Sequence, residues 1–167
     1  QSLHQGELPI NWDSKNKKEQ QLVASYIRRQ LQTLHIQPTE KGPYAVRAGE
    51  LAHLKTDFHF ALRETNSLGD MLKLLHPTPA VCGLPKEKAY RFILSQEGYD
   101  RSYYSGLIGN LNPSGRTDLY VNLRCMHIGK ERLTLYAGGG LLPTSKLADE
   151  WNETEKKLQT MLAITNN

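Results

Sequence analysis

The chain has 167 residues, 38% hydrophobic and 23% charged, so it is long enough to bury a core and has the composition of a globular protein. No apolar run approaches the length of about 20 residues that a membrane-spanning helix needs, so we expect no membrane partner. Its net charge of +4 could favour nucleic acid, but the basic residues are scattered, and an anionic small ligand explains the charge equally well. The two cysteines, Cys82 and Cys125, form no CxxC motif and indicate reduced thiols in a cytoplasmic protein.

The first half of the chain predicts two helices and two strands. Apolar residues at helical spacing predict a helix over residues 17–34. Strands are predicted over residues 44–48 and 51–62, because apolar and polar side chains alternate along the second of them. Ser67 is the expected N-cap of a short helix that ends at Leu75.

The second half predicts a helix, three strands and a final helix. The prolines of His76-Pro77-Thr78-Pro79 exclude helix interior there, and Pro85 suits the start of the next helix. Strands follow over residues 103–110, 119–127 and 132–137. Ser145 is the expected cap of a last helix that reaches about residue 164 and has the apolar stripe Leu147, Trp151, Leu158, Met161 and Leu162. The predicted helices and strands together indicate an α+β fold in which helices pack on mostly antiparallel strands.

The last helix carries the first candidate site. Glu150 and Glu153 lie three residues apart, so they are neighbours on the helix surface, with Lys157 one turn further on. Two carboxylates so placed repel each other unless a cation lies between them, and Mg²⁺ takes such ligands together with water and ligand oxygens. The spacing alone also fits a solvated helix face on which Glu153 pairs with Lys157, and it favours that alternative.

Three further features are candidates. Glu19 extends the apolar stripe of the first helix, unless it lies in an exposed first turn where it favours the helix dipole. Arg124 is expected on a central strand, either as a bidentate carboxylate clamp or as an ordinary surface arginine. The run Gly138, Gly139 and Gly140 follows a strand and either lets backbone N–H groups approach an anion or forms a flexible turn.

These residues together resemble the chorismate-utilising enzymes over nearly the whole chain. The resemblance is carried by short blocks: Glu19-Gln20-Gln21-Leu22-Val23, His53-Leu54-Lys55-Thr56, Leu75-His76-Pro77-Thr78-Pro79-Ala80-Val81-Cys82-Gly83, Asp100-Arg101, Tyr104-Ser105-Gly106-Leu107-Ile108-Gly109, Asn122-Leu123-Arg124-Cys125, Ala137-Gly138-Gly139-Gly140, and Glu150-Trp151-Asn152-Glu153-Thr154 with Lys157. Within that family, the His-Pro-Thr-Pro-Ala stretch and the Arg-Cys pair look most like isochorismate synthases of menaquinone or siderophore pathways.

The resemblance implies a role for each matched position. Glu19 and Glu153, with Glu150 beside them, match the carboxylates that bind Mg²⁺, which holds a carboxylate of chorismate. The substrate-binding positions are then Arg124, Lys157 and backbone N–H groups at Gly138, Gly139 and Gly140 for the carboxylates, and His53, Ala80, Val81 and Tyr104 around the ring.

The chain departs from the family in length. Members of the family are roughly twice as long. Their amino-terminal half contains a lysine base, which activates water for addition at ring C2, and a glutamic acid, which assists loss of the C4 hydroxyl. We find neither group here. Residues 1–167 are therefore expected to form the carboxy-terminal part of one chorismate-binding domain, to need the amino-terminal half as partner, and to be inactive alone.

Rival functions remain open at this stage. Salicylate synthases resemble the chain equally in architecture but tend to have Thr where Ala80 stands. Anthranilate and aminodeoxychorismate synthases usually carry Gly-Ala-Pro-Lys where this chain has Gly83-Leu84-Pro85-Lys86. A small basic binding module without chemistry is the rival of another class, and binding that falls steeply with salt would identify it.

Overall fold

The computed structural model describes residue 12 and residues 14–48, 51–62, 67–112 and 114–165. The chain divides into two compact units, Gln1–Pro79 and Ala80–Asn167, and each is described by itself. Among the described residues, no helix is both long enough and apolar enough to span a membrane. The elements are helices and antiparallel strand pairs, as the predicted α+β class requires.

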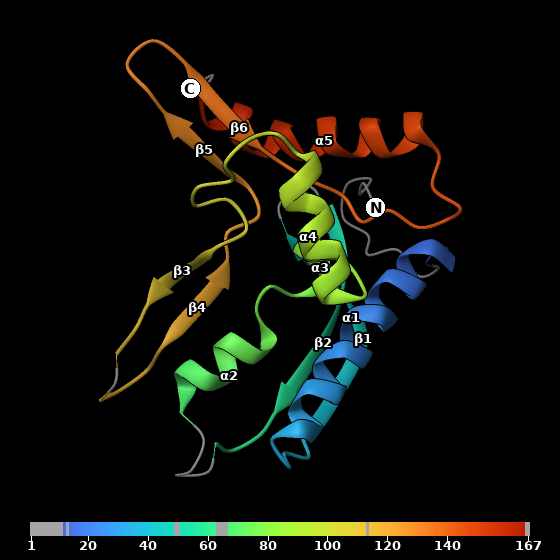
Figure 1. The fold of residues 1–167 in the computed structure, drawn as a ribbon, viewed down its shortest axis with the longest axis vertical. Helices are drawn as coiled ribbons and strands as arrows, with labels where there is room; N and C mark the ends of the chain where they lie inside the picture. Colours follow the sequence, from blue (N-terminus) through green and yellow to red (C-terminus); the bar gives the residue numbers. More distant parts are fainter. Residues whose placement is uncertain (1–11, 13, 49–50, 63–66, 113, 166–167) are drawn as a thin grey trace. The chain divides into compact units, whose positions relative to one another are not determined.

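The first unit is a helix packed on a β-hairpin. It contains α1 (Ser14–Thr33), β1 (Thr39–Ala48), β2 (Leu51–His59) and α2 (Leu68–Leu75), with α1 in contact with β2 and α2 (Figure 1). The helix predicted over residues 17–34 is confirmed, with its start three residues earlier. Five hydrophobic residues of this unit are buried: Ala24, Tyr26, Leu31, Ile36 and Ala52.

The first strand of the hairpin is longer than predicted because β1 passes through a bulge, whereas β2 ends at His59, before the predicted end at residue 62. The register slips between Lys41 and Tyr44, so that Gly42 and Pro43 lie inside the strand rather than before it. Gly42 has φ +127°, and a Cβ there would lie 2.6 Å from the Lys55 carbonyl oxygen. A glycine at this position therefore allows the two strands to approach each other.

The predicted cap of α2 is confirmed. The backbone N–H of Asp70 donates to Ser67 Oγ at 3.0 Å, which satisfies one of the N–H groups that a helix start leaves without an intrahelical acceptor. At the other end, the Tyr26 hydroxyl donates to the Leu74 carbonyl at 3.0 Å and so ties α1 to the last turn of α2.

The second unit contains two successive β-hairpins and the final helix. Its elements are α3 (Pro79–Cys82), which begins at the unit boundary, α4 (Lys86–Gln96), β3 (Leu107–Asn110), β4 (Asp118–Val121), β5 (Cys125–Ile128), β6 (Leu133–Tyr136) and α5 (Leu147–Thr165). β3 pairs with β4 and β5 with β6, both antiparallel. The helix expected after Pro85 is confirmed as α4. The strand predicted over residues 132–137 is confirmed as β6. The one predicted over residues 103–110 is shorter, as β3, and the one predicted over residues 119–127 is divided into β4 and β5.

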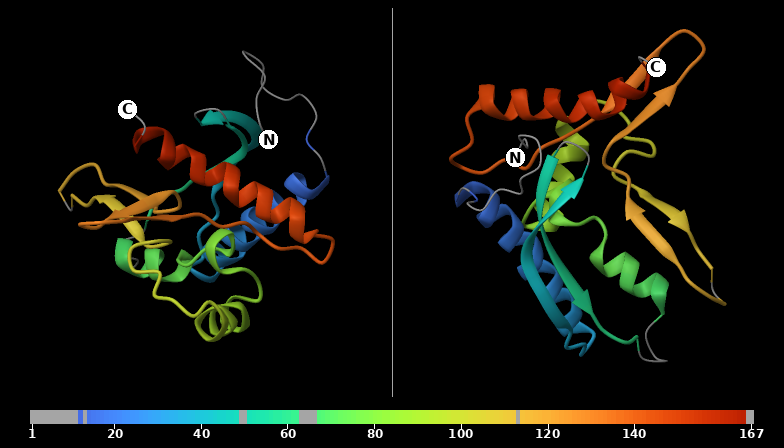
Figure 2. Two further views of the ribbon diagram at one scale, coloured as in Figure 1. Left: turned by 90° about the horizontal axis from the view of Figure 1, so that it is seen from above. Right: turned by 180° about the vertical axis from the view of Figure 1, so that it is seen from behind.

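Long-range hydrogen bonds explain the shorter strands. The N–H of Ser105 donates to the Asn122 carbonyl, and the N–H of Asn122 to the Gly106 carbonyl, both at 2.8 Å, where residues 101–106 form turns. The chain then bends at residues 122–124 and changes partner from β3 to β6. The two hairpins extend in opposite directions from this bend (Figure 2). Arg124 therefore lies in the bend, and its expected place on a strand is wrong.

The last helix begins later and faces differently than predicted. Ser145 Oγ accepts from the Leu142 N–H at 3.0 Å and closes the preceding turn, so it is not the N-cap of α5. Leu147 and Trp151 are 86% and 64% exposed, which contradicts their place in a buried stripe, whereas Glu150 is 6% exposed. The covered face instead combines charged and apolar residues: Glu150, Glu153, Lys157, Leu158, Met161 and Leu162. Residues 137–146 run alongside this helix before turning into it (Figures 1 and 2).

We predict that Gly109→Ala destabilises the fold by about 2 kcal/mol or more, because Gly109 has φ +152° and a Cβ would lie 1.9 Å from the Asp118 carbonyl oxygen. Urea unfolding followed by circular dichroism measures the change. Gly98→Ala is the matched control: its φ is +69° but no atom lies within 4 Å of the new Cβ, so it should cost about 1 kcal/mol. An equal loss of unfolding free energy in both variants would contradict the close contact between Gly109 and the Asp118 carbonyl as the cause.

Candidate functional site

The candidate site of the second unit begins at the glycine run after β6. The Gly138 carbonyl accepts a hydrogen bond from Lys157 Nζ at 3.0 Å. A Cβ on Gly138 would lie 2.5 Å from the Tyr104 hydroxyl oxygen. Among the described residues, Gly138, Gly139 and Gly140 are not in the positive-φ region. Glycine is needed at position 138 because a side chain would displace Tyr104, rather than to permit an unusual backbone angle.

The charged face of α5 lies against the same glycines. Lys157 Nζ lies 2.7 Å from Glu153 Oε1, so the predicted i,i+4 pair is present. A Cβ on Gly139 would lie 3.6 Å from Glu150 Oε2 and 4.0 Å from Lys157 Nζ. The structure thus brings Glu150, Glu153 and Lys157 together beside the glycine run, as a cluster rather than a fully solvated helix face.

Tyr104 connects this cluster to the strands. Its ring is 9% exposed and stacks on Tyr136 of β6, with ring centroids 5.5 Å apart and planes 19° from parallel. Burial raises the pKa of the Tyr104 phenol. The hydroxyl is therefore neutral at pH 7 and can donate a hydrogen bond, which suits a pocket for an anion.

Arg101 is part of the site although it was not a predicted site residue. Its Nε donates to Glu97 Oε2 at 2.7 Å and its Nη1 to the Val81 carbonyl at 2.8 Å, while its guanidinium lies 5.5 Å from the centre of the Tyr104 ring. Two signals were available: Asp100-Arg101 is one of the blocks that carry the resemblance, and Glu97 and Arg101 have i,i+4 spacing, although such pairs are common on protein surfaces.

The remaining predicted residues of this unit lie around the network. Val81 takes part through its carbonyl, whereas Ala80 is exposed beside it on α3. Arg124 is half-buried in the bend between β4 and β5. Its role as a carboxylate clamp stays a prediction.

Glu19 and His53 belong to the first unit. Glu19 lies in the second turn of α1, half-buried, with its Oε1 3.8 Å from Lys15 Nζ, so the exposed-first-turn alternative is wrong. His53 lies on β2 opposite Val46 and is half-buried. A metal ion shared by Glu19 with the carboxylates of α5 stays a prediction.

The chemistry of the α5 carboxylates fits a hard divalent cation. Glu150 and Glu153 present oxygen donors from successive turns of one helix, and Mg²⁺ prefers such donors. Lys157 Nζ pairs with one oxygen of Glu153, so a metal ion at these carboxylates would share Glu153 with the ammonium. Within the described residues, no group of three or more His, Cys, Asp or Glu side chains is placed to hold a metal ion.

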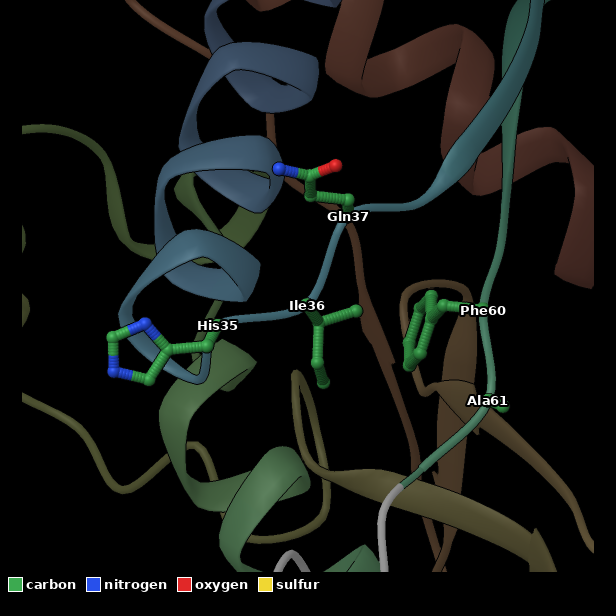
Figure 3. Close-up of a pocket in the computed structure, with 5 residues that line it drawn as sticks. All are labelled: His35, Ile36, Gln37, Phe60 and Ala61. Carbon is green, nitrogen blue, oxygen red and sulfur yellow. The ribbon is translucent and has the colours of Figure 1, made fainter.

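A separate pocket lies in the first unit. Its volume is about 460 Å³, and it is lined by residues where α1 ends and where β2 ends: His35, Ile36, Gln37, Phe60 and Ala61 (Figure 3). None of the predicted site residues lines it. The candidate site is therefore defined by the contacts around Tyr104 and Lys157, not by this cavity.

Comparison with known proteins identifies the family of this chain. The sequence model of the family "Chorismate binding enzyme" matches residues 7–166, so the chain belongs to the chorismate binding enzyme family. Isochorismate synthase EntC of Escherichia coli K12 is 31% identical over 154 residues, which are 90% of this chain and 39% of EntC.

Two solved structures share the fold. The crystal structure of DhbC from Bacillus anthracis superposes with a TM-score of 0.82 at 32% identity, over 92% of this chain and 42% of that one. MenF, the menaquinone-specific isochorismate synthase of Escherichia coli, superposes with a TM-score of 0.78 at 32% identity. The match covers 89% of this chain and 34% of MenF. The chain spans about two fifths of the length of its curated relative EntC.

We predict that Glu97→Gln lowers stability by about 1 kcal/mol at pH 7 and that this effect becomes smaller as the pH is lowered. The hydrogen bond from Arg101 lowers the pKa of Glu97, so its contribution is complete above the unfolded value of about 4.3 and is lost as the pH falls through the folded pKa. Urea unfolding of both proteins from pH 3 to pH 7 measures this. A difference that does not change with pH would contradict the ion pair as its cause.

Proposed function

We propose that this chain is the metal- and carboxylate-binding portion of an isochorismate synthase, which isomerises chorismate to isochorismate for menaquinone or siderophore biosynthesis. The family membership and the relatives EntC and MenF support this assignment. The observation that carries it is the Lys157 ammonium, which lies between Glu153 and the Gly138 carbonyl next to the buried Tyr104. This arrangement places a cation, hydrogen-bond donors and an aromatic surface at one site.

The charges of the site suit a ligand with two carboxylates. Lys157 supplies a positive charge at the glycine run, and Arg124 is the second cation that the resemblance assigns to a substrate carboxylate. Arg124 lies half-buried in the bend that follows β4. The backbone N–H groups of Gly138, Gly139 and Gly140 add donors that need no further charge.

The acidic residues require a cation of their own. Glu150 and Glu153 would repel a substrate carboxylate, and Lys157 neutralises only part of that charge. Glu150 and Glu153 would hold Mg²⁺, with Glu19 as the further ligand that the resemblance implies. When bound, Mg²⁺ would neutralise these carboxylates and bind a carboxylate of chorismate.

The uncharged residues would orient the ring. Tyr104 is fixed by its stack on Tyr136 and offers a neutral hydroxyl beside Gly138. Val81, Ala80 and His53 complete the ring-facing set that the resemblance implies. These groups bind and orient the substrate, so that the barrier is lowered by positioning once the proton-transferring groups are present.

We predict that Mg²⁺ strengthens chorismate binding to the 167-residue chain, and that Glu150→Gln abolishes most of this gain, about tenfold in Kd. Isothermal titration with chorismate, with and without Mg²⁺, measures both. Glu155→Gln is the matched control, because Glu155 lies exposed on the same helix. Equal Mg²⁺ effects in the wild type and in Glu150→Gln would reject the assigned metal ligands.

We predict that the same chain converts no chorismate to isochorismate above the uncatalysed rate, because the base lysine and acid glutamate expected in the family are not found in it. Chromatography of reaction mixtures with Mg²⁺ measures the products, and the titration above serves as the control for folding. Turnover at a rate comparable with a full-length isochorismate synthase would refute the expected inactivity of this chain. Salicylate together with pyruvate would instead favour salicylate synthase.

A further inference from the structure

We propose that Arg101 is a positioning residue for this site: it fixes the ring of Tyr104 and the carbonyl of Val81 relative to each other. The inference rests on the proposed function, since Tyr104 and Val81 are the ring-facing residues of that proposal. Arg101 is outside the set of residues assigned to metal or substrate. It acts through its neighbours.

Arg101 makes contacts with three separate parts of the second unit. Its Nε donates to Glu97 Oε2 at 2.7 Å, and its Nη2 contacts the other Glu97 oxygen, at the end of α4. Its Nη1 donates to the Val81 carbonyl of α3 at 2.8 Å and to Ser105 Oγ at 3.3 Å. The side chain is 22% exposed, so these contacts are partly shielded from water. One guanidinium therefore joins α3, α4 and the turn that carries Tyr104.

The turn needs such a link because its backbone is strained. Ser102 and Ser105 have φ +50° and +61°, a region that non-glycine residues seldom occupy. Strained angles persist only where the surrounding contacts hold them. Arg101 lies at the start of this turn, and its hydrogen bond to Ser105 Oγ spans it. Tyr104 lies within the turn, so the direction of its ring depends on these contacts.

The guanidinium also touches the ring itself. It lies 5.5 Å from the centroid of the Tyr104 ring, within the range of a cation–π contact, and Tyr136 stacks on the same ring. Because the Tyr104 hydroxyl lies against Gly138, a rotation of the ring would move it relative to the carbonyl that Lys157 holds. Arg101 thus influences the anion-binding end of the site without touching the anion.

A lysine at position 101 could not make the same set of contacts. A guanidinium is a planar fork that can bind Glu97 through two nitrogens while a third donates to Val81. An ammonium keeps the charge but cannot meet both partners in this geometry. Arg101→Lys therefore tests positioning separately from charge.

The experiment compares Arg101→Lys with the matched control Arg116→Lys in the full 167-residue chain. Arg116 also binds a carboxylate, that of Asp118, but its side chain is 84% exposed and contacts none of the site residues named here. Aromatic NMR resonances of Tyr104, assigned with Tyr104→Phe, report the ring position. Tyr103, which is 85% exposed, gives the reference for a solvated ring.

We expect the Tyr104 resonances to shift toward those of Tyr103 in Arg101→Lys and to stay in place in Arg116→Lys. A purely stabilising role would lower the melting temperature but leave the Tyr104 resonances of the folded chain unchanged, and that result overturns the proposal. The unaltered protein gives a second measurement in case Arg101→Lys does not fold. A nuclear Overhauser effect between the Arg101 side chain and the Tyr104 ring supports the proposal, and its absence overturns it.

Chorismate titration in the presence of Mg²⁺ separates this inference from the proposed function. We expect Arg101→Lys to weaken chorismate binding about tenfold and Arg116→Lys to leave it unchanged. If the wild type binds no chorismate, the proposed function fails, while the NMR result still decides whether Arg101 positions Tyr104. A shifted Tyr104 with unchanged chorismate affinity would overturn the inference alone.

Discussion

The close approach of Tyr104 to Gly138 is the constraint on which the site of the second unit depends. With no side chain at position 138, the tyrosine hydroxyl can lie against the backbone, and the carbonyl of the same residue accepts the Lys157 ammonium. Lys157 in turn pairs with Glu153, so one glycine connects an aromatic ring, a cation and a carboxylate. The stack on Tyr136, the turn held by Arg101 and the chain beside α5 all keep this approach in place.

The features that sequence predicted well depend on neighbouring residues. The cap at Ser67 forms within one turn, and α4 begins directly after Pro85, so local chemistry determines both. Helical spacing predicted that Glu150, Glu153 and Lys157 are neighbours but favoured a solvated helix face, and the resemblance to chorismate-utilising enzymes implied a function for them. The spacing could not show that the glycine run lies against that helix, because the contact joins residues far apart in the sequence.

The features that sequence missed depend on distant partners. The strand predicted through residues 119–127 is interrupted because Asn122 bonds to residues 105 and 106, and no local pattern contains that pairing. Leu147 and Trp151 suggested the covered face of α5, but the covered face includes Glu150 instead. Hydrophobic periodicity assigns the buried face of a helix to apolar residues, so it fails where a charged residue such as Glu150 takes part of that face.

The covered face of α5 has a consequence for how its two ends respond to solution conditions. Its first turns contact their surroundings through Glu150, Glu153 and Lys157, whereas its later turns present Leu158, Met161 and Leu162. Dissolved salt screens interactions between partly exposed charges but does not weaken the burial of apolar side chains in the same way. Ionic strength therefore weakens the contacts of the first turns of this helix more than those of its later turns, so the stability of its two ends depends on salt to different degrees.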